Sequence, residues 1–312
     1  MGVQAFAFYS RLFKDLPSNI DVPEQVNACF AFFLPPLACG ACPCAVRVGG
    51  GFSVIVTGGR AWYTDIMMQR KRDSGGIKAA FADRGNGMQQ QGFWLDGRRV
   101  TVYSAPAPRI LFLQPVDEHD GSVADSEAAA MEGCPLPFAL AAFSVEDWNR
   151  ELSPWEAPPV FGKVPFGGGA EDTLCFVERL LPVLRARLAL GDDVPVCLGG
   201  YSLAGLFALW AATRTEVFSG VAAASPSVWF PGWLDYVEAH PIRADTIYLS
   251  LGDREERTKN PTMATVGQRI RALHDLLQAE HTVTLEWNRG NHFQDSEKRT
   301  ARAFCWLAQS MR

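Results

Sequence analysis

The sequence predicts an α/β fold, with a mostly parallel central sheet and helices on both of its faces. Two observations predict this fold. From about residue 92 onward, strand-like segments alternate with segments of helical periodicity. Several of the strand-like segments are continuous apolar runs, as expected of strands that are covered on both faces. The first 87 residues lack this alternation, so we predict a boundary near Met88, with an N-terminal extension over 1–87 and the α/β domain over 88–312.

The elements of the domain follow one another from its start. Asp96-Gly97 separates two short strand-like segments, which indicates a tight hairpin because glycine accepts a positive φ. Helical spacing of leucines predicts a covering helix that ends before Gly191. The further predicted strands are 109–114, 138–143, 194–198, 220–224, 246–251 and 282–286, and the predicted helices are 173–190, 203–212, 266–277 and 297–311.

Composition excludes several classes of protein. The 312 residues are 48% hydrophobic and carry a formal net charge of -5, so no basic field is available to attract nucleic acid or anionic membrane. The apolar run 29–46 is interrupted by three prolines and a glycine, which predicts no membrane span. No apolar stretch stands directly behind a basic start, so we expect a cytoplasmic protein that acts on a small molecule. No pattern indicates an oligomeric state.

The segment 199–205 contains the candidate nucleophile, Ser202, between a predicted strand and a predicted helix. A serine on such a sharp turn has strained backbone angles, and the residues two before and two after it must be small. Gly200 and Ala204 meet this requirement, although alanine departs from a strict G-x-S-x-G pattern. The N–H of Leu203, at the start of the helix, could donate to an oxyanion. The alternative interpretation is a glycine-rich connection with an incidental serine.

His292 is the candidate general base, because it follows the last predicted strand and precedes the closing helix. A serine nucleophile needs a neighbouring base that accepts its proton. Of the other four histidines, three lie in or beside helical segments. His119 follows an early strand, but its position before Ser202 would break the order of serine, acid and histidine, so we interpret it as a loop residue near the site.

The acid is expected after the predicted strand 246–251, where the chain carries Asp253, Glu255 and Glu256. An acid at this place orients the imidazole and stabilises its cation, which either type of carboxylate can do. We rank Glu255 first, Asp253 second and Glu256 third. The alternative for this cluster is a solvated charged turn.

These residues resemble the esterase family of α/β-hydrolases that includes esterase D, feruloyl esterases, mycolyl transferases and trilactone siderophore esterases. The resemblance covers roughly residues 92–312 and rests on the segments 200–205, 224–229, 252–255 and 290–293. It implies the α/β-hydrolase fold and hydrolysis of a carboxylic ester through an acyl-enzyme, without metal or cofactor. In this family the acid often stands three residues after the glycine that ends its strand, which favours Glu255.

The same resemblance implies further site residues. The second oxyanion amide is expected near Val116 or Asp117, and Tyr201 and Trp229 are expected on the substrate side. An acyltransferase or a peptidase could use the same three residues, and a non-catalytic binding module could retain the fold. The sequence leaves these alternatives open.

The first 87 residues resemble no family that we can name. Four cysteines suggest zinc, but their spacing lacks the paired knuckles of common structural sites, so we predict no metal. These are Cys29, Cys39, Cys42 and Cys44. A further hypothesis is that this stretch precedes the authentic start of the protein, with Met88 as its first residue.

Overall fold

The chain divides into two compact units, 1–77 and 78–312. The computed structural model describes the backbone of 44–48, 52–57, 60–63 and 82–83, and describes 88–118 and 122–312 in full. In the first unit, the described residues form an antiparallel sheet of three strands, β1 (Cys44–Val48), β2 (Phe52–Thr57) and β3 (Arg60–Tyr63). The boundary predicted near Met88 stays a prediction.

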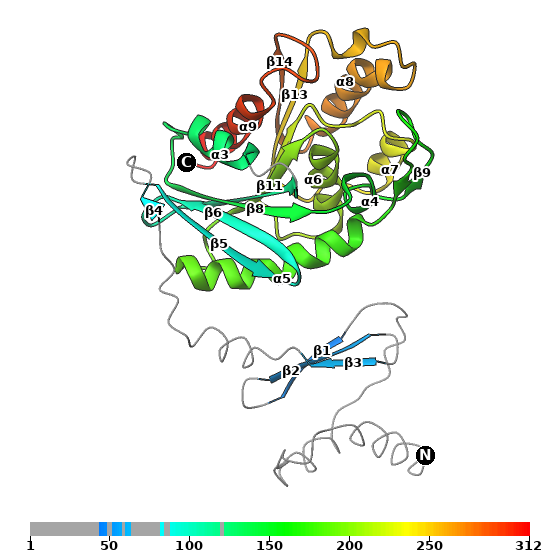
Figure 1. Cartoon of the computed structure of the whole chain (residues 1–312). Helices are drawn as coiled ribbons and strands as arrows, with labels where there is room; N and C mark the ends of the chain where they lie inside the picture. Colours follow the sequence, from blue (N-terminus) through cyan, green and yellow to red (C-terminus); the bar gives the residue numbers. More distant parts are fainter. Residues whose placement is uncertain (1–43, 49–51, 58–59, 64–81, 84–87, 119–121) are drawn as a thin grey trace, which may run out of the picture. The chain divides into compact units, whose positions relative to one another are not determined.

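The second unit is built on a nine-stranded sheet of order β14-β13-β12-β11-β7-β8-β6-β5-β4 in its described part (Figure 1). The six strands from β14 to β8 run parallel, and the other three continue the sheet antiparallel. The mostly parallel sheet predicted from the sequence is therefore confirmed. The strands are β4 (Ala82–Asp83), β5 (Gln89–Leu95), β6 (Arg98–Ser104), β7 (Ile110–Asp117), β8 (Phe138–Val145), β11 (Val196–Tyr201), β12 (Gly220–Ala224), β13 (Thr246–Gly252) and β14 (Thr282–Asn288).

Helices cover both faces of this sheet, as predicted (Figure 1). Alternate residues of a strand point to opposite faces, and β12 shows this clearly. Val221 and Ala223 belong to the core cluster that contains side chains of α5, α6 and α8, whereas Ala222 and Ala224 belong to the cluster with α3 and α9. The helices are α3 (Val123–Ala130), α4 (Trp148–Glu151), α5 (Ala170–Leu188), α6 (Leu203–Arg214), α7 (Trp233–Ala239), α8 (Val266–Leu277) and α9 (Ser296–Ser310).

Shorter elements complete the unit. Two short 3-10 turns precede α8, and a two-stranded ribbon lies in the segment between β8 and α5. These elements are η2 (Glu255–Arg257), η3 (Met263–Thr265), β9 (Glu156–Ala157) and β10 (Phe166–Gly167). None of the described helices is long and apolar enough to cross a membrane.

The predicted hairpin is confirmed. β5 and β6 pair antiparallel around Asp96 and Gly97, which have φ values of 48° and 80°. Two consecutive positive φ values are what a two-residue turn requires to match the twist of its strands.

Several boundaries differ from those predicted, and two of these differences have a clear physical cause. The covering helix ends at Leu188, because Ala189 adopts the left-handed conformation at φ 52° and Gly191 lies beyond it. β7 continues past Gln114 to Asp117, although Pro115 cannot donate a hydrogen bond. The strand tolerates this proline because β11 pairs with β7 only as far as Leu113.

Candidate active site

Ser202 lies at the sharp turn between β11 and α6. Its φ of 59° and ψ of -118° are strained for a residue with a side chain, at a cost of about 1–3 kcal/mol. Two backbone hydrogen bonds hold the turn: the Ser202 N–H donates to Ala224 O at 3.0 Å, and the Ser227 N–H donates to Ser202 O at 3.0 Å. The serine thus stands at the carboxyl end of β11, where the strand order reverses and ligands of open α/β sheets bind.

The small residues around Ser202 have a steric reason. A Cβ atom at Gly200 would lie 2.6 Å from the Cβ of Ala204, which is closer than two carbon atoms that are not bonded to each other can approach. Alanine is therefore tolerated at 204 because residue 200 is glycine. A Cβ at Gly205 would lie 3.1 Å from Gly200 O, so this second glycine lets α6 approach β11.

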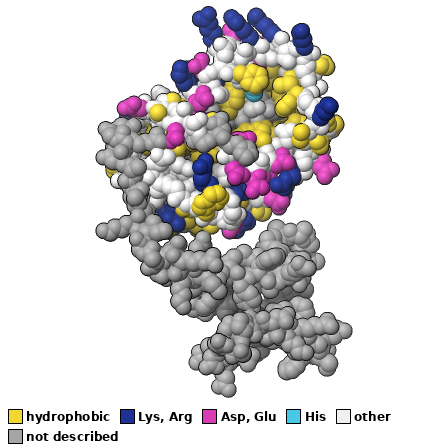
Figure 2. Space-filling view, viewed as in Figure 1, with side chains coloured by type: hydrophobic (Ala, Val, Ile, Leu, Met, Phe, Trp, Pro, Cys, Tyr) yellow, Lys and Arg dark blue, Asp and Glu magenta, His cyan; other side chains and the backbone are white. Residues whose placement is uncertain are grey.

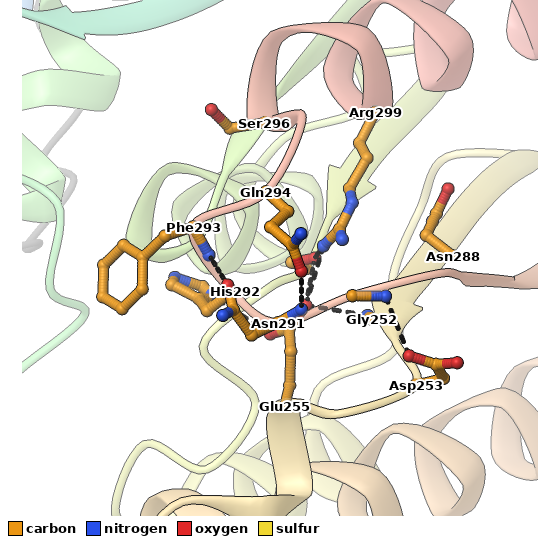
Figure 3. A network of polar contacts seen from close by, with 12 residues as sticks. Gly252, Asp253, Glu255, Asn288, Asn291, His292, Phe293, Gln294, Ser296 and Arg299 are labelled. Carbon is orange, nitrogen blue, oxygen red and sulfur yellow. Dashed lines mark hydrogen bonds and ion pairs between the residues drawn. The ribbon is translucent and has the colours of Figure 1, made fainter.

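His292 and Glu255 lie beside Ser202 in a chain of hydrogen bonds. The Ser202 hydroxyl donates to His292 Nε2 at 3.0 Å, and His292 Nδ1 donates to Glu255 Oε2 at 2.7 Å. The loop after β14 presents the histidine, and η2, which follows β13, presents the carboxylate (Figure 3). The three residues follow β11, β13 and β14, parallel strands whose carboxyl ends share one edge of the sheet, with β12 between β11 and β13.

The other carboxylates of this turn have different partners. Asp253 Oδ1 accepts the Gly290 N–H at 2.8 Å, which ties the loop after β13 to the loop of His292. Glu256 forms an ion pair with Arg271 at 3.5 Å. The structure therefore brings Glu255 to the imidazole and engages Asp253 and Glu256 elsewhere.

The second oxygen of Glu255 is held by groups that the sequence did not suggest. Oε1 accepts hydrogen bonds from Ser225 Oγ at 2.8 Å, the Gly252 N–H at 2.7 Å and Arg299 Nη1 at 3.1 Å. Arg299 reaches the carboxylate from α9 and is only 2% exposed (Figure 3). Because the carboxylate side chain is only 4% exposed, this arginine is the counter-ion that makes its burial tolerable.

Tyr201 supports the loop that carries the imidazole. Its hydroxyl donates to the backbone O of His292 at 2.7 Å and accepts from Arg299 Nη1 at 3.0 Å. Burial raises the pKa of this hydroxyl to about 12, so it remains a donor at any ordinary pH. The hydroxyl of Tyr201 is thus occupied by the protein, and a contact of its ring with substrate stays a prediction.

Leu203 and Asp117 are the best placed of the expected oxyanion donors. Leu203 is the first residue of α6, so its N–H has no partner within the helix. In β7 the Leu111 N–H donates to Pro195 O beside β11, whereas the Glu118 N–H donates to Val145 O of β8. Since successive N–H groups of a strand alternate in direction, the N–H of Asp117 points to the β11 side and that of Val116 to β8.

A cavity of about 210 Å³ adjoins the imidazole and is lined by His292, Glu255 and Trp229, among others. Trp229 is 5% exposed and packs against two phenylalanine rings. Its place in the lining is compatible with the expected role on the substrate side, which stays a prediction. His119 lies outside the described residues.

The cysteines considered for zinc cannot be placed at a site. Three of them, Cys29, Cys39 and Cys42, lie outside the described residues, and only the backbone of Cys44 is described. Within the described part of the chain, no three His, Cys, Asp or Glu side chains are grouped as metal ligands.

Loss of Arg299 is expected to destabilise the protein. In Arg299→Met a methionine of similar length would leave the buried Glu255 without its counter-ion. We expect the free energy of unfolding to fall by about 3 kcal/mol, the lower end for a broken buried pair, because three hydrogen-bond donors to Glu255 remain. Urea unfolding followed by circular dichroism measures this loss.

Arg302→Met is the matched control. Arg302 lies on the same helix and pairs with Glu286, but its side chain is 54% exposed. Removal of an exposed ion pair costs at most about 1 kcal/mol. Equal losses in the two variants would contradict the role assigned to Arg299.

Solved structures of esterases and hydrolases resemble this fold. An IroE-like serine hydrolase from Shewanella oneidensis is 16% identical, with 72% of this chain and 81% of that chain covered at a TM-score of 0.59. The siderophore hydrolase EstA from Aspergillus nidulans is 17% identical. The match covers 72% of this chain and 95% of that chain, with a TM-score of 0.54. The enterobactin esterase FES from Shigella flexneri is 19% identical. The match covers 72% of this chain and 60% of that chain, with a TM-score of 0.52. At these identities the likeness shows the fold, which is that of α/β-hydrolases.

The sequence itself identifies the family. No curated protein matches the chain in sequence. The family model described as "Putative esterase" matches residues 127–293, which is more than half of the chain and includes Ser202, Glu255 and His292. The chain therefore belongs to this esterase family of the α/β-hydrolase fold and is a carboxylic ester hydrolase.

Proposed function

We propose that the protein hydrolyses carboxylic esters through a triad of Ser202, His292 and Glu255 and an acyl-enzyme intermediate. The observation that carries the proposal is the unbroken chain of hydrogen bonds from Ser202 Oγ through the imidazole to Glu255, with links of 3.0 and 2.7 Å. Serine, base and orienting acid within hydrogen-bond reach are the signature of an activated nucleophile.

Acylation follows from this geometry. His292 Nε2 takes the proton of Ser202 as the serine oxygen attacks the ester carbonyl carbon. The N–H groups of Leu203 and Asp117 donate to the oxyanion that forms. The imidazolium then gives its proton to the leaving alkoxide, the bond between carbonyl carbon and alkoxide oxygen breaks, and an alcohol departs from the acyl-enzyme.

Deacylation repeats these steps with water. His292 accepts a proton from water, the hydroxide oxygen attacks the acyl carbon, and the serine oxygen leaves and recovers the proton. The carboxylic acid departs. The His292 side chain is 22% exposed, which supports access of water to the imidazole. Glu255 stabilises the imidazolium in both halves of the reaction, and Arg299 holds the carboxylate in position from the opposite side.

Labelling with a fluorophosphonate probe tests the proposal. An activated serine displaces fluoride from phosphorus, whereas an unactivated one reacts slowly. We expect one label per chain, on the peptide that contains Ser202, and no label in Ser202→Ala. In His292→Ala, labelling should slow by at least about 100-fold, the lower range for loss of a general base.

The matched control is Ser310→Ala, which removes an exposed hydroxyl of α9 and should label as the wild type does. Labelling at another residue, or undiminished labelling in His292→Ala, would contradict the proposal. Absence of labelling in the folded wild-type protein would instead favour a non-catalytic binding module.

A further inference from the structure

The cavity beside His292 has two arginines in its wall, Arg254 and Arg257. They lie in and beside η2, the turn that also presents Glu255. Both side chains are exposed, so they can reorient toward a ligand without loss of buried contacts. The cavity therefore combines the imidazole with two guanidinium groups.

Among the described residues, no carboxylate forms an ion pair with the arginines of this cavity. Glu255 is the only carboxylate that lines it among the described residues, and Glu255 already contacts His292 and Arg299. Glu256, which stands between the two arginines in the chain, pairs with Arg271 instead. In the part of the chain that the structure describes, neither Arg254 nor Arg257 forms an ion pair with a carboxylate. Two arginines thus line the cavity without an ion pair to a carboxylate of the described residues.

The remaining wall of the cavity is largely apolar. Trp229 lines it from a packed position, and Phe293, which is 89% exposed, stands edge-on to the His292 ring at 5.5 Å between centroids. In Figure 3 the ring of Phe293 points away from the polar network. Figure 2 shows hydrophobic side chains around a hollow on one face of the molecule. An exposed phenyl ring is stabilised when a ligand covers it.

We propose that this cavity selects esters that carry a negatively charged group, which Arg254 and Arg257 bind while Trp229 and Phe293 contact its carbon skeleton. The inference rests on the function proposed above, because the same His292 lines the cavity. Arginine suits this task because its planar donors match the oxygens of a carboxylate or a phosphate.

Two pairs of esters test the proposal. Mono-4-nitrophenyl glutarate and 4-nitrophenyl valerate place a charged or a neutral end on the acyl side. 4-Acetoxybenzoate and its methyl ester place a charged or a neutral group on the alcohol side. For each pair we measure the ratio of kcat/KM for the charged ester to that for the neutral ester. In Arg254→Gln and in Arg257→Gln this ratio should fall about tenfold in at least one pair, as for loss of a hydrogen bond between charged groups. In the double variant it should fall further.

Lys259→Gln is the matched control, because it removes an exposed positive charge two residues from Arg257 that does not line the cavity. Its ratios should equal those of the wild type. Ratios that stay unchanged in both arginine variants, or that fall as far in Lys259→Gln, would overturn the proposal, since the charge preference would then not arise in the cavity.

Binding without turnover separates this inference from the proposed function. Calorimetry with Ser202→Ala uses both charged esters, mono-4-nitrophenyl glutarate and 4-acetoxybenzoate. We expect that the ester whose kcat/KM ratio the arginine substitutions lower binds, and that a second substitution, Arg257→Gln, raises its Kd about tenfold. An equal Kd in the two proteins overturns the anionic subsite. Ester turnover that persists in Ser202→Ala contradicts the triad, whereas turnover that requires Ser202 but ignores the arginines contradicts only the inference.

Discussion

Ser202→Ala is expected to lower kcat for 4-nitrophenyl acetate by about 10⁴-fold or more. In the proposed mechanism, the Ser202 oxygen is the atom of the triad that bonds to the acyl group, so the substitution leaves no group that can form the acyl-enzyme. Alanine keeps the Cβ atom of serine, and the strained turn at φ 59° therefore experiences no new steric conflict. Steady-state kinetics of the purified variant, with circular dichroism to verify folding, measure the effect.

A neighbouring serine provides a demanding control. Ser227 Oγ lies 3.3 Å from Ser202 Oγ, and the side chain is buried. Among the described residues, no hydrogen bond links Ser227 to the imidazole of His292, whose Nε2 is hydrogen-bonded to Ser202. Ser227→Ala should thus lose far less activity than Ser202→Ala. A larger loss in Ser227→Ala would identify a different nucleophile and contradict the triad.

Local sequence is sufficient to locate the turn of Ser202. Its requirements are short-range: a strand before it, a helix after it and small residues two positions away on either side. The steric contact between Gly200 and Ala204 shows why this short-range pattern is informative. His292 was located by chain order, which reflects the fixed sequence of strands and loops in such a sheet. Helices and strands with strong hydrophobic periodicity can also be predicted from local sequence, because their pattern is short-range.

The residues that position the histidine and its acid cannot be found from local sequence or chain order. Arg299 contacts Glu255 across 44 positions of the chain, and only the packing of α9 on the sheet brings the two together. One signal was present: Arg299 stands on the same helix face as Ala303 and Leu307, so a charge occupies an otherwise buried stripe. The choice between Asp253 and Glu255 also needed tertiary structure, because both carboxylates follow the same strand and only the course of η2 decides which one meets the imidazole.

The assignment of Glu255 as the acid predicts a second large loss of activity. Glu255→Gln is expected to lower kcat by about 10³- to 10⁴-fold, the range for loss of the orienting charge behind a catalytic histidine. The amide can still accept a hydrogen bond from Nδ1, but it carries no charge to stabilise the imidazolium. It also leaves Arg299 buried without a counter-ion, so the kinetics are measured at a temperature at which circular dichroism shows the variant to be folded.

Asp253→Asn is the matched comparison, since it removes one carboxylate charge from the same turn. Asp253 is exposed, and the asparagine Oδ1 can still accept the Gly290 N–H that fixes the histidine loop. We expect its kcat to stay within about tenfold of the wild type, because exposed charges contribute little. A collapse of activity in Asp253→Asn with a mild effect in Glu255→Gln would reassign the acid. The loop would then have to rearrange during catalysis so that Asp253 exchanges Gly290 for the imidazole.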